Sequence, residues 1–246
     1  MTLPEGAADR FERVLAGPTA TDLAQPELLP SRWARAAASS LPVDGAGLSL
    51  YAEDGVRVPL GASDRLAARA EQLQFSYGAG PCLRAHDTGT SIAFDRAEIV
   101  RNWPGLWESL VAETTFHAVF STPLAPPLGP SLVLDLYLRD EEQVHSLDRD
   151  EVEGVVVRLT GHAARALTSA EHGEVAWWRA PDACRRTRVW EAVGVVAVRL
   201  ERDTSDALAV LKAHAVATGQ VVEDVAEHVL TGQLGVLELD AAPRPD

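Results

Sequence analysis

The sequence contains little cysteine and no long hydrophobic run. Cys82 and Cys184 are its two cysteines, and their separation fits neither a disulfide framework nor a zinc-binding pattern. A reducing, cytoplasmic location is therefore the simplest expectation. The N-terminus has no apolar signal segment, and no stretch approaches the roughly 20 apolar residues that span a bilayer. We therefore expect no membrane partner.

The chain also lacks an excess of basic residues, since its formal net charge is −14. A charge of this sign repels nucleic acid at long range, so any contact with RNA must come from a local basic patch. The 246 residues are 46% apolar. That length and composition can bury the core of one large domain or two small ones.

Motifs for catalysis and for metal binding are missing from the sequence. Its seven histidines form no HExxH pattern or local cluster, and no serine lies in a Ser/His/Asp arrangement. We therefore predict a protein that is not an enzyme, with no catalytic residue, no metal site and no cofactor. Cys82 is a redox sensor if Arg84 lowers its thiol pKa, and otherwise a small buried apolar residue, which is the more common role.

Residues 1–26 read as a leader, and residues 27–170 alternate between helical and extended patterns. A helix starts near Ser31, and Asp54-Gly55 predicts a hairpin turn. Together these patterns predict an α+β domain, an antiparallel sheet with flanking helices packed on one face. The expected strands are 47–51, 56–60, 118–123 and 131–139, and the expected helices include 64–74 and 148–169.

This region contains four distinctive stretches: Gly45-Ala46-Gly47-Leu48-Ser49-Leu50, Gln74 with Gly78-Ala79-Gly80-Pro81-Cys82, Arg101-Asn102-Trp103-Pro104 and Ser121-Thr122-Pro123-Leu124. Together they resemble a GAF domain, a small-molecule sensor. The resemblance implies an unknown small-molecule ligand, held in a pocket with aromatic walls. The expected lining residues are Phe75, Tyr77, Gly80, Cys82, Phe94, Trp103 and Trp107, although such aromatic residues more often form a plain hydrophobic core than a ligand cage.

The C-terminal part carries apolar residues at steps of three and four between residues 189 and 232, which predicts three amphipathic helices. Each is too short to be stable alone, so the three must share a core. Asp203 and Thr204 can cap the second helix, and Gly219 and Gly232 suit left-handed C-terminal positions. We expect a linker at 171–184, where Pro181 interrupts the helical pattern, the three-helix domain at 185–236 and a tail at 237–246.

This C-terminal pattern resembles an ANTAR domain, the three-helix RNA-binding module of bacterial antitermination regulators. The matching residues are Ala192-Val193-Gly194, Asp206-Ala207-Leu208, Leu211-Lys212-Ala213-His214-Ala215 and Asp224-Val225-Ala226. The order of the two regions is similar to actinobacterial proteins that place a GAF domain before ANTAR. The resemblance implies binding to RNA hairpin loops, and the expected RNA contacts are Arg185, Arg186, Arg188, Arg199, Lys212 and His214.

The charge of this segment leaves the RNA-binding role open. Residues 185–234 contain six basic and seven acidic residues, a net charge of −1. The turn before the third helix, Gly219-Gln220-Val221-Val222-Glu223, lacks the basic residues that the family commonly carries there. The arginines are therefore either phosphate contacts or an ordinary solvated helix face.

These observations lead to one hypothesis and one alternative. The hypothesis is a signal-responsive regulator that binds RNA hairpins and acts by transcription antitermination, as a homodimer. The apolar face of the helix at 148–169, with Val152, Val155, Val156, Leu159, Ala163 and Leu167, is the expected dimer seam. The alternative is a ligand- or protein-binding scaffold whose C-terminal helices serve only for oligomerisation.

Overall fold

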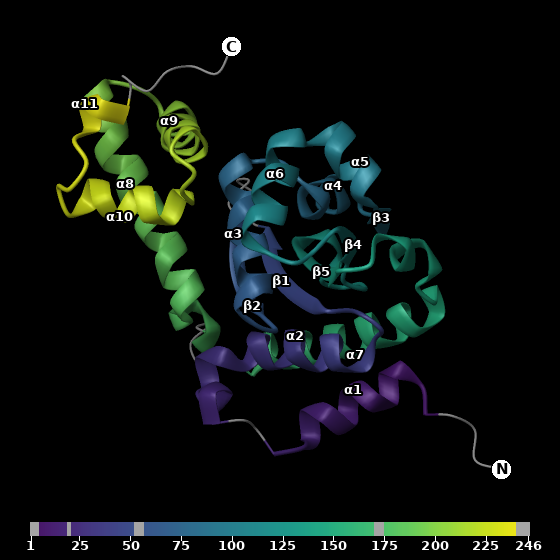
Figure 1. Cartoon of the computed structure of the whole chain (residues 1–246). Coiled ribbons are helices and arrows are strands. Elements are labelled where there is room, and N and C mark those ends of the chain that lie inside the picture. Colours follow the sequence, from purple (N-terminus) through teal and green to yellow (C-terminus); the bar gives the residue numbers. More distant parts are fainter. Residues whose placement is uncertain (1–4, 19–20, 52–56, 170–174, 240–246) are drawn as a thin grey trace.

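A five-stranded antiparallel sheet forms the centre of the first part of the chain (Figure 1). The computed structural model describes residues 5–18, 21–51, 57–169 and 175–239. The strand order is β2-β1-β5-β4-β3, which confirms the predicted α+β class. The strands are β1 (Gly45–Tyr51), β2 (Arg57–Ala62), β3 (Ile92–Phe94), β4 (Ala118–Pro123) and β5 (Leu132–Leu138).

Helices cover both faces of the sheet, so the expectation that they pack on one face was wrong. One face carries α2 (Leu29–Ser40) and α7 (Arg149–Thr168), with α1 (Ala7–Ala16) packed against these two helices on the side away from the sheet, and the other face carries α3 to α6 (Figure 1). The physical reason is visible in β5, whose seven residues are all buried. A strand buried on both sides needs a cover on each face. The second layer is α3 (Arg65–Tyr77), α4 (Pro81–Thr88), α5 (Arg96–Asn102) and α6 (Pro104–Glu113).

The apolar face of α7 packs inside the chain and is not available as a dimer seam. Val155, Leu159 and Ala163 are fully buried in the core that α1, α2 and the sheet share. Leu167, which the same pattern includes, is exposed at the end of the helix. The core also takes in α1, because Phe11 is fully buried. Part of the expected leader therefore completes the core of the sheet region.

Four helices follow the sheet region and form a second hydrophobic core, as predicted for three of them. They are α8 (Pro181–Leu200), α9 (Thr204–Ala217), α10 (Val222–Leu230) and the short α11 (Val236–Leu239); we call them the C-terminal helices. Val193, Leu211 and Val225 are buried at the centre of this second core.

The ends of these helices follow the residues that the sequence places there. The Asp203 side chain accepts a hydrogen bond from the Asp206 amide at 2.8 Å, and Gly219 and Gly232 have φ angles of 64° and 75°. Pro181 does not interrupt a helix but occupies the first turn of α8, where its missing N–H costs nothing. Residues 181–184 of the expected linker therefore belong to α8.

Shorter elements and segments complete the description. The Asp54-Gly55 turn and residues 171–174 of the expected linker lie outside the described residues. Among the helices that the structure describes, none has the length and apolar character needed to cross a bilayer. Short 3-10 turns occur at Thr21–Leu23, Pro26–Leu28, Gly129–Ser131, Glu141–Ser146 and Ala176–Arg179.

Two glycines test how tightly each part is packed. A Cβ at Gly61 in β2 would collide with the Ser31 backbone in α2, whereas a Cβ at Gly194 in α8 meets nothing within 4 Å. We expect Gly61→Ala to lower the free energy of unfolding by about 1–3 kcal/mol. Gly194→Ala should raise it by up to about 1 kcal/mol, because alanine favours the helix. Urea unfolding of both variants measures the difference, and equal effects would contradict the described packing.

Candidate functional site

A cluster of polar side chains lies buried between the sheet and helix α3. Along β5, the leucines from Leu132 to Leu138 face the core shared with α2 and α7, while Asp135 and Tyr137 point to the opposite face. Neighbouring strands and α3 supply the other members. We call Ser49, Arg57, Glu71, Gln74, Ser121, Asp135 and Tyr137 the polar cluster; each is at most 7% exposed.

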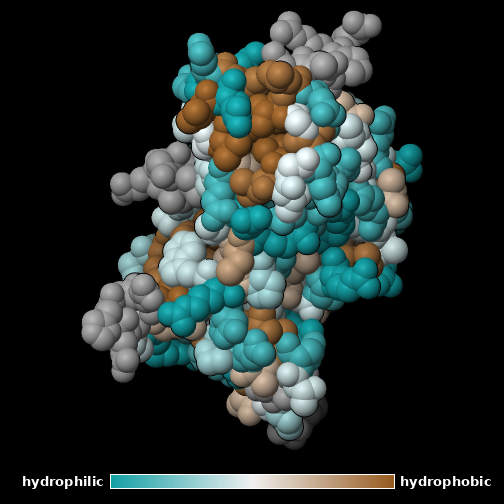
Figure 2. All heavy atoms as spheres, turned by 90° about the vertical axis from the view of Figure 1, so that its left-hand side faces the viewer, coloured by the Kyte–Doolittle hydropathy of each residue, from teal (hydrophilic) through white to brown (hydrophobic). Residues whose placement is uncertain are grey.

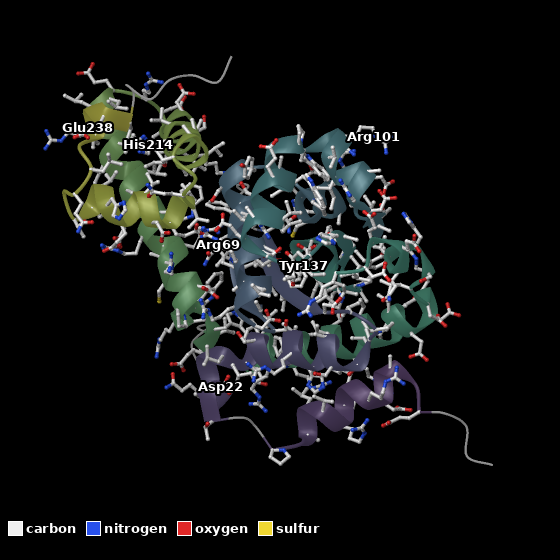
Figure 3. The ribbon with its side chains drawn as sticks, viewed as in Figure 1. Asp22, Arg69, Arg101, Tyr137, His214 and Glu238 are labelled. Atoms are coloured by element: carbon white, nitrogen blue, oxygen red, sulfur yellow. The ribbon has the colours of Figure 1, made fainter. Side chains whose placement is uncertain are left out.

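Hydrogen bonds join the members of the polar cluster across the sheet. Asp135 accepts from the Ser121 hydroxyl at 2.5 Å and from Gln74 Nε2 at 2.9 Å. Tyr137 donates its hydroxyl proton to Glu71 Oε1 at 2.6 Å and accepts from Gln74 Nε2 at 2.9 Å. The cluster therefore links the central strand β5 to α3 through side chains (Figure 3, where Tyr137 is labelled).

The two buried carboxylates of the cluster have different partners. Glu71 pairs with the Arg57 guanidinium and accepts from the Ser49 hydroxyl at 2.7 Å. Asp135 is bonded only to neutral donors, and its burial, reinforced by the nearby Glu71 charge, raises its pKa to about 7. Burial also raises the pKa of Tyr137. Asp135 is therefore the group of the cluster that changes charge near neutral pH.

Gly80 and Cys82, both expected to line a ligand pocket, lie against this cluster. Gly80 has φ 151°, and a Cβ there would lie 2.7 Å from Gln74 Oε1. The same Gln74 oxygen accepts the Cys82 amide at 2.9 Å. Gln74 thus fills the space beside the glycine-rich loop and connects it to Asp135.

The position of Cys82 favours packing over redox sensing. Its thiol is buried and accepts the Tyr51 hydroxyl at 3.1 Å. Burial raises the pKa of this thiol, and the charge of Arg57 only partly opposes the effect. A reactive thiol needs the opposite shift.

Four of the aromatic residues expected around a ligand pack against neighbouring side chains of the protein instead. The Phe94 and Trp103 rings lie 5.1 Å apart, and Trp107 lies 5.9 Å from the His117 ring. The Tyr77 hydroxyl is 2.8 Å from Ser109 Oγ. All four contribute to the core between the sheet and helices α3, α5 and α6. The sequence left open whether these residues line a ligand pocket or form a hydrophobic core. In the structure they form a core.

Phe75 faces away from that core, towards the C-terminal helices. The Arg186 guanidinium carbon lies 3.1 Å from the centre of its ring, and Lys212 Nζ lies 4.3 Å from it. We call these three residues the Phe75 contact. A cation held against an aromatic face away from water contributes about 2 kcal/mol.

Arg186, expected to contact RNA, is 1% exposed. Its guanidinium pairs with Glu223 at 2.7 Å and donates to the Arg57 carbonyl at 2.7 Å. Burial lowers its pKa to about 10. Breaking a buried pair by removing one partner costs about 3–5 kcal/mol, so Arg186 is not available to a phosphate in this arrangement. The sequence carried the signal, because Arg186 continues the apolar spacing of Val189 and Val193.

The other arginines of α8 are accessible at the surface. Arg185 pairs with Asp224 at 2.6 Å and Arg188 with Glu227 at 3.0 Å, while Arg199 is exposed near the end of the helix. Surface pairs of this kind contribute only about 0–1 kcal/mol each. A phosphate group can therefore replace these carboxylates at small cost.

Lys212 and His214 lie on different sides of α9, although the sequence places them two residues apart. Residues at this spacing do not share a helix face. Lys212 faces Phe75, while His214 lies near Glu238 of α11 (Figure 3). Burial lowers the pKa of Lys212 to about 8, with the nearby Arg186 charge acting in the same direction. The six expected RNA contacts therefore do not form one surface in this structure.

Among the residues that the structure describes, two groups bring possible metal ligands within 4.8 Å of one another. The first is Glu71, Cys82 and Asp135, and the second is Asp95, Glu98 and His145. In the first group Arg57 supplies the positive charge, and hydroxyl and amide donors occupy the carboxylate oxygens. In the second, Asp95 and Glu98 form the capping box of α5. Both groups have structural roles without a metal.

Comparison with the models of known protein families finds no match for this chain. The search of the curated proteins also finds no match. The functional reading therefore rests on the residues and their geometry.

The polar cluster predicts how stability depends on pH. When folding raises the pKa of a carboxyl group, the protonated group stabilises the folded state. This stabilisation is lost as the pH rises from the pKa of the group in the unfolded chain to its pKa of about 7 in the folded protein. The full effect is on the order of 4 kcal/mol. Asp135→Asn keeps the shape and removes the charge, so its unfolding free energy relative to the native protein should increase between pH 5 and pH 8.

Urea unfolding at the two pH values measures this difference. Asp87→Asn, an exposed substitution on α4, serves as the control. Its unfolding free energy should differ from that of the native protein by the same amount at both pH values. The assignment of Asp135 is contradicted if Asp135→Asn also shows the same difference from the native protein at both pH values.

Proposed function

We propose that the protein is a signal-responsive RNA-binding regulator of the GAF-ANTAR kind that acts by transcription antitermination. The sheet region is the sensor, and the C-terminal helices bind RNA hairpin loops. The observed order of an α+β sheet region followed by a compact helical region supports this proposal. The sequence motifs of both families fall within these two regions.

The observation that carries the proposal is the distribution of accessible arginines on α8. At about 100° per residue, Arg185, Arg188 and Arg199 fall within an arc of about 60° on one side of the helix. All three lie on the surface or near it, and the carboxylates that pair with Arg185 and Arg188 are held only by exposed ion pairs. Where phosphates take the place of these carboxylates, the row of cations supplies the local positive charge that an acidic chain needs.

A second function is favoured by an exposed apolar area on the same helices. Val198 of α8 is 79% exposed and Leu237 of α11 is 76% exposed. Figure 2 shows hydrophobic side chains gathered over the upper part of the C-terminal helices. An exposed patch of this kind is typical of protein-binding surfaces. The alternative is therefore a dimeric scaffold that uses these helices for protein contacts alone, with the homodimer formed here rather than through α7.

Binding to a pool of RNA hairpins with randomised loops tests the proposal. We expect the native protein to retain a subset of hairpins at low salt. The double variant Arg185→Gln/Arg188→Gln should bind that subset at least tenfold more weakly. Its binding should also depend less on salt, because each lost phosphate contact lowers the slope of log K against log salt by about 0.7–0.9.

Arg101→Gln/Arg139→Gln is the matched control. It removes two arginines from the sheet region, where Arg101 lies far from the C-terminal helices (Figure 3) and Arg139 forms a surface pair with Asp44. This control should bind as the native protein does. If the native protein enriches no hairpin from the pool, the antitermination function is wrong and the scaffold is favoured.

A further inference from the structure

The Phe75 contact joins the sensor to the helices that carry the expected RNA contacts. Phe75 lies near the C-terminal end of α3, and its ring contacts cations from two different C-terminal helices, Arg186 of α8 and Lys212 of α9. A single side chain of the sensor therefore holds two of the six residues expected to contact RNA.

The sheet region and the C-terminal helices each contribute one hydrophobic residue to the core of the other, which reinforces this contact. Phe75 belongs to the core of the C-terminal helices, whereas Val221, in the turn before α10, belongs to the core of α3, α6 and the sheet. Both are at most 5% exposed. Each part therefore completes the hydrophobic core of the other.

Two hydrogen bonds fix the relative position of the two parts. The Val222 amide donates to the Ser76 hydroxyl at 2.9 Å, and Arg186 donates to the Arg57 carbonyl at 2.7 Å. The first of these hydrogen bonds uses the turn 219–223, the stretch that departs from the basic pattern of the ANTAR family. Its residues serve the contact with α3 in this structure.

Lys212 is the only lysine in the 246-residue sequence. A Cβ placed at Gly78, just after α3, would lie 3.2 Å from Lys212 Nζ, so the amine also lies close to the sensor backbone. Its cation therefore faces the end of α3 and not open solvent.

We propose that the Phe75 contact is an autoinhibitory latch, which withholds Lys212 and the adjoining face of α9 from RNA until α3 and the C-terminal helices separate. The latch is argued from the geometry above, and its effect on RNA rests on the proposed function. In the latched arrangement Arg185, Arg188 and Arg199 of α8 remain accessible, so the closed protein binds RNA weakly and the open protein binds it with both helices.

The latch is tested with a lysine-specific protease, for which this chain has one cleavage site, after Lys212. Phe75→Leu keeps an apolar side chain and removes the aromatic face that holds both cations. We expect the full-length variant to be cleaved after Lys212 at least tenfold faster than the native protein, and to bind the selected RNA hairpins at least tenfold more tightly.

Ser76→Ala is a milder second variant, because it removes only the hydroxyl that accepts the Val222 amide. It should accelerate cleavage by a smaller factor. Phe120→Leu is the matched control. It removes a ring that lies 4.3 Å from the Arg149 cation inside the sheet region, and it should leave the cleavage rate within about twofold of the native value once both are compared at equal global stability.

The outcomes separate the latch from the proposed function. Unchanged cleavage in both Phe75→Leu and Ser76→Ala overturns the latch, whatever the RNA result. Faster cleavage with RNA binding equal to that of the native protein overturns autoinhibition. Faster cleavage with no hairpin bound by any variant supports the latch and contradicts the RNA-binding function.

Discussion

The position of the C-terminal helices depends on the burial of one charged group, the Arg186 guanidinium. Transferring such a charge from water into the protein costs several kcal/mol unless partners replace the lost hydration. Here the partners come from three other elements: the Glu223 carboxylate of α10, the Arg57 carbonyl of β2 and the ring of Phe75 in α3. Because two of these belong to the sheet region, moving the helices away from α3 removes part of what stabilises the buried charge. The same contacts hold the two regions together.

The polar cluster lies next to this charge and shares Arg57 with it. The Arg57 guanidinium binds Glu71 within the cluster, and its carbonyl accepts Arg186 at the boundary with α8. A continuous set of hydrogen bonds thus runs from Asp135 through Tyr137 and Glu71 to the C-terminal helices. These side chains fill the space between β5 and α3. Under the proposed function, a change of charge at Asp135 or a displacement of the cluster side chains is passed through Glu71 to Arg57, the residue that supports Arg186.

Local features of the fold were predictable from the sequence, whereas the features that arise from packing between regions were not. Asp203, Gly219 and Gly232 mark helix ends through their own chemistry, so their roles were confirmed. The coverage of both sheet faces was not predicted, although the apolar residues on both sides of Asp135 in β5 indicate it. The arginine cluster is expected at the surface because arginine is charged. The helical spacing, however, places Arg186 on the same face of α8 as the buried Val189. That Phe75 would meet Lys212 had no sequence signal, since the contact exists only after two regions pack.

The central claim is that Phe75 holds Lys212 against the end of α3 in the native protein. Because the chain has one lysine, protein labelled with ¹³C-lysine gives a single ε-methylene signal in a nuclear magnetic resonance spectrum. The structure predicts that this signal is shifted upfield by the Phe75 ring and titrates at about pH 8. An unshifted signal that titrates near the ordinary lysine value of about 10.4 would contradict the account.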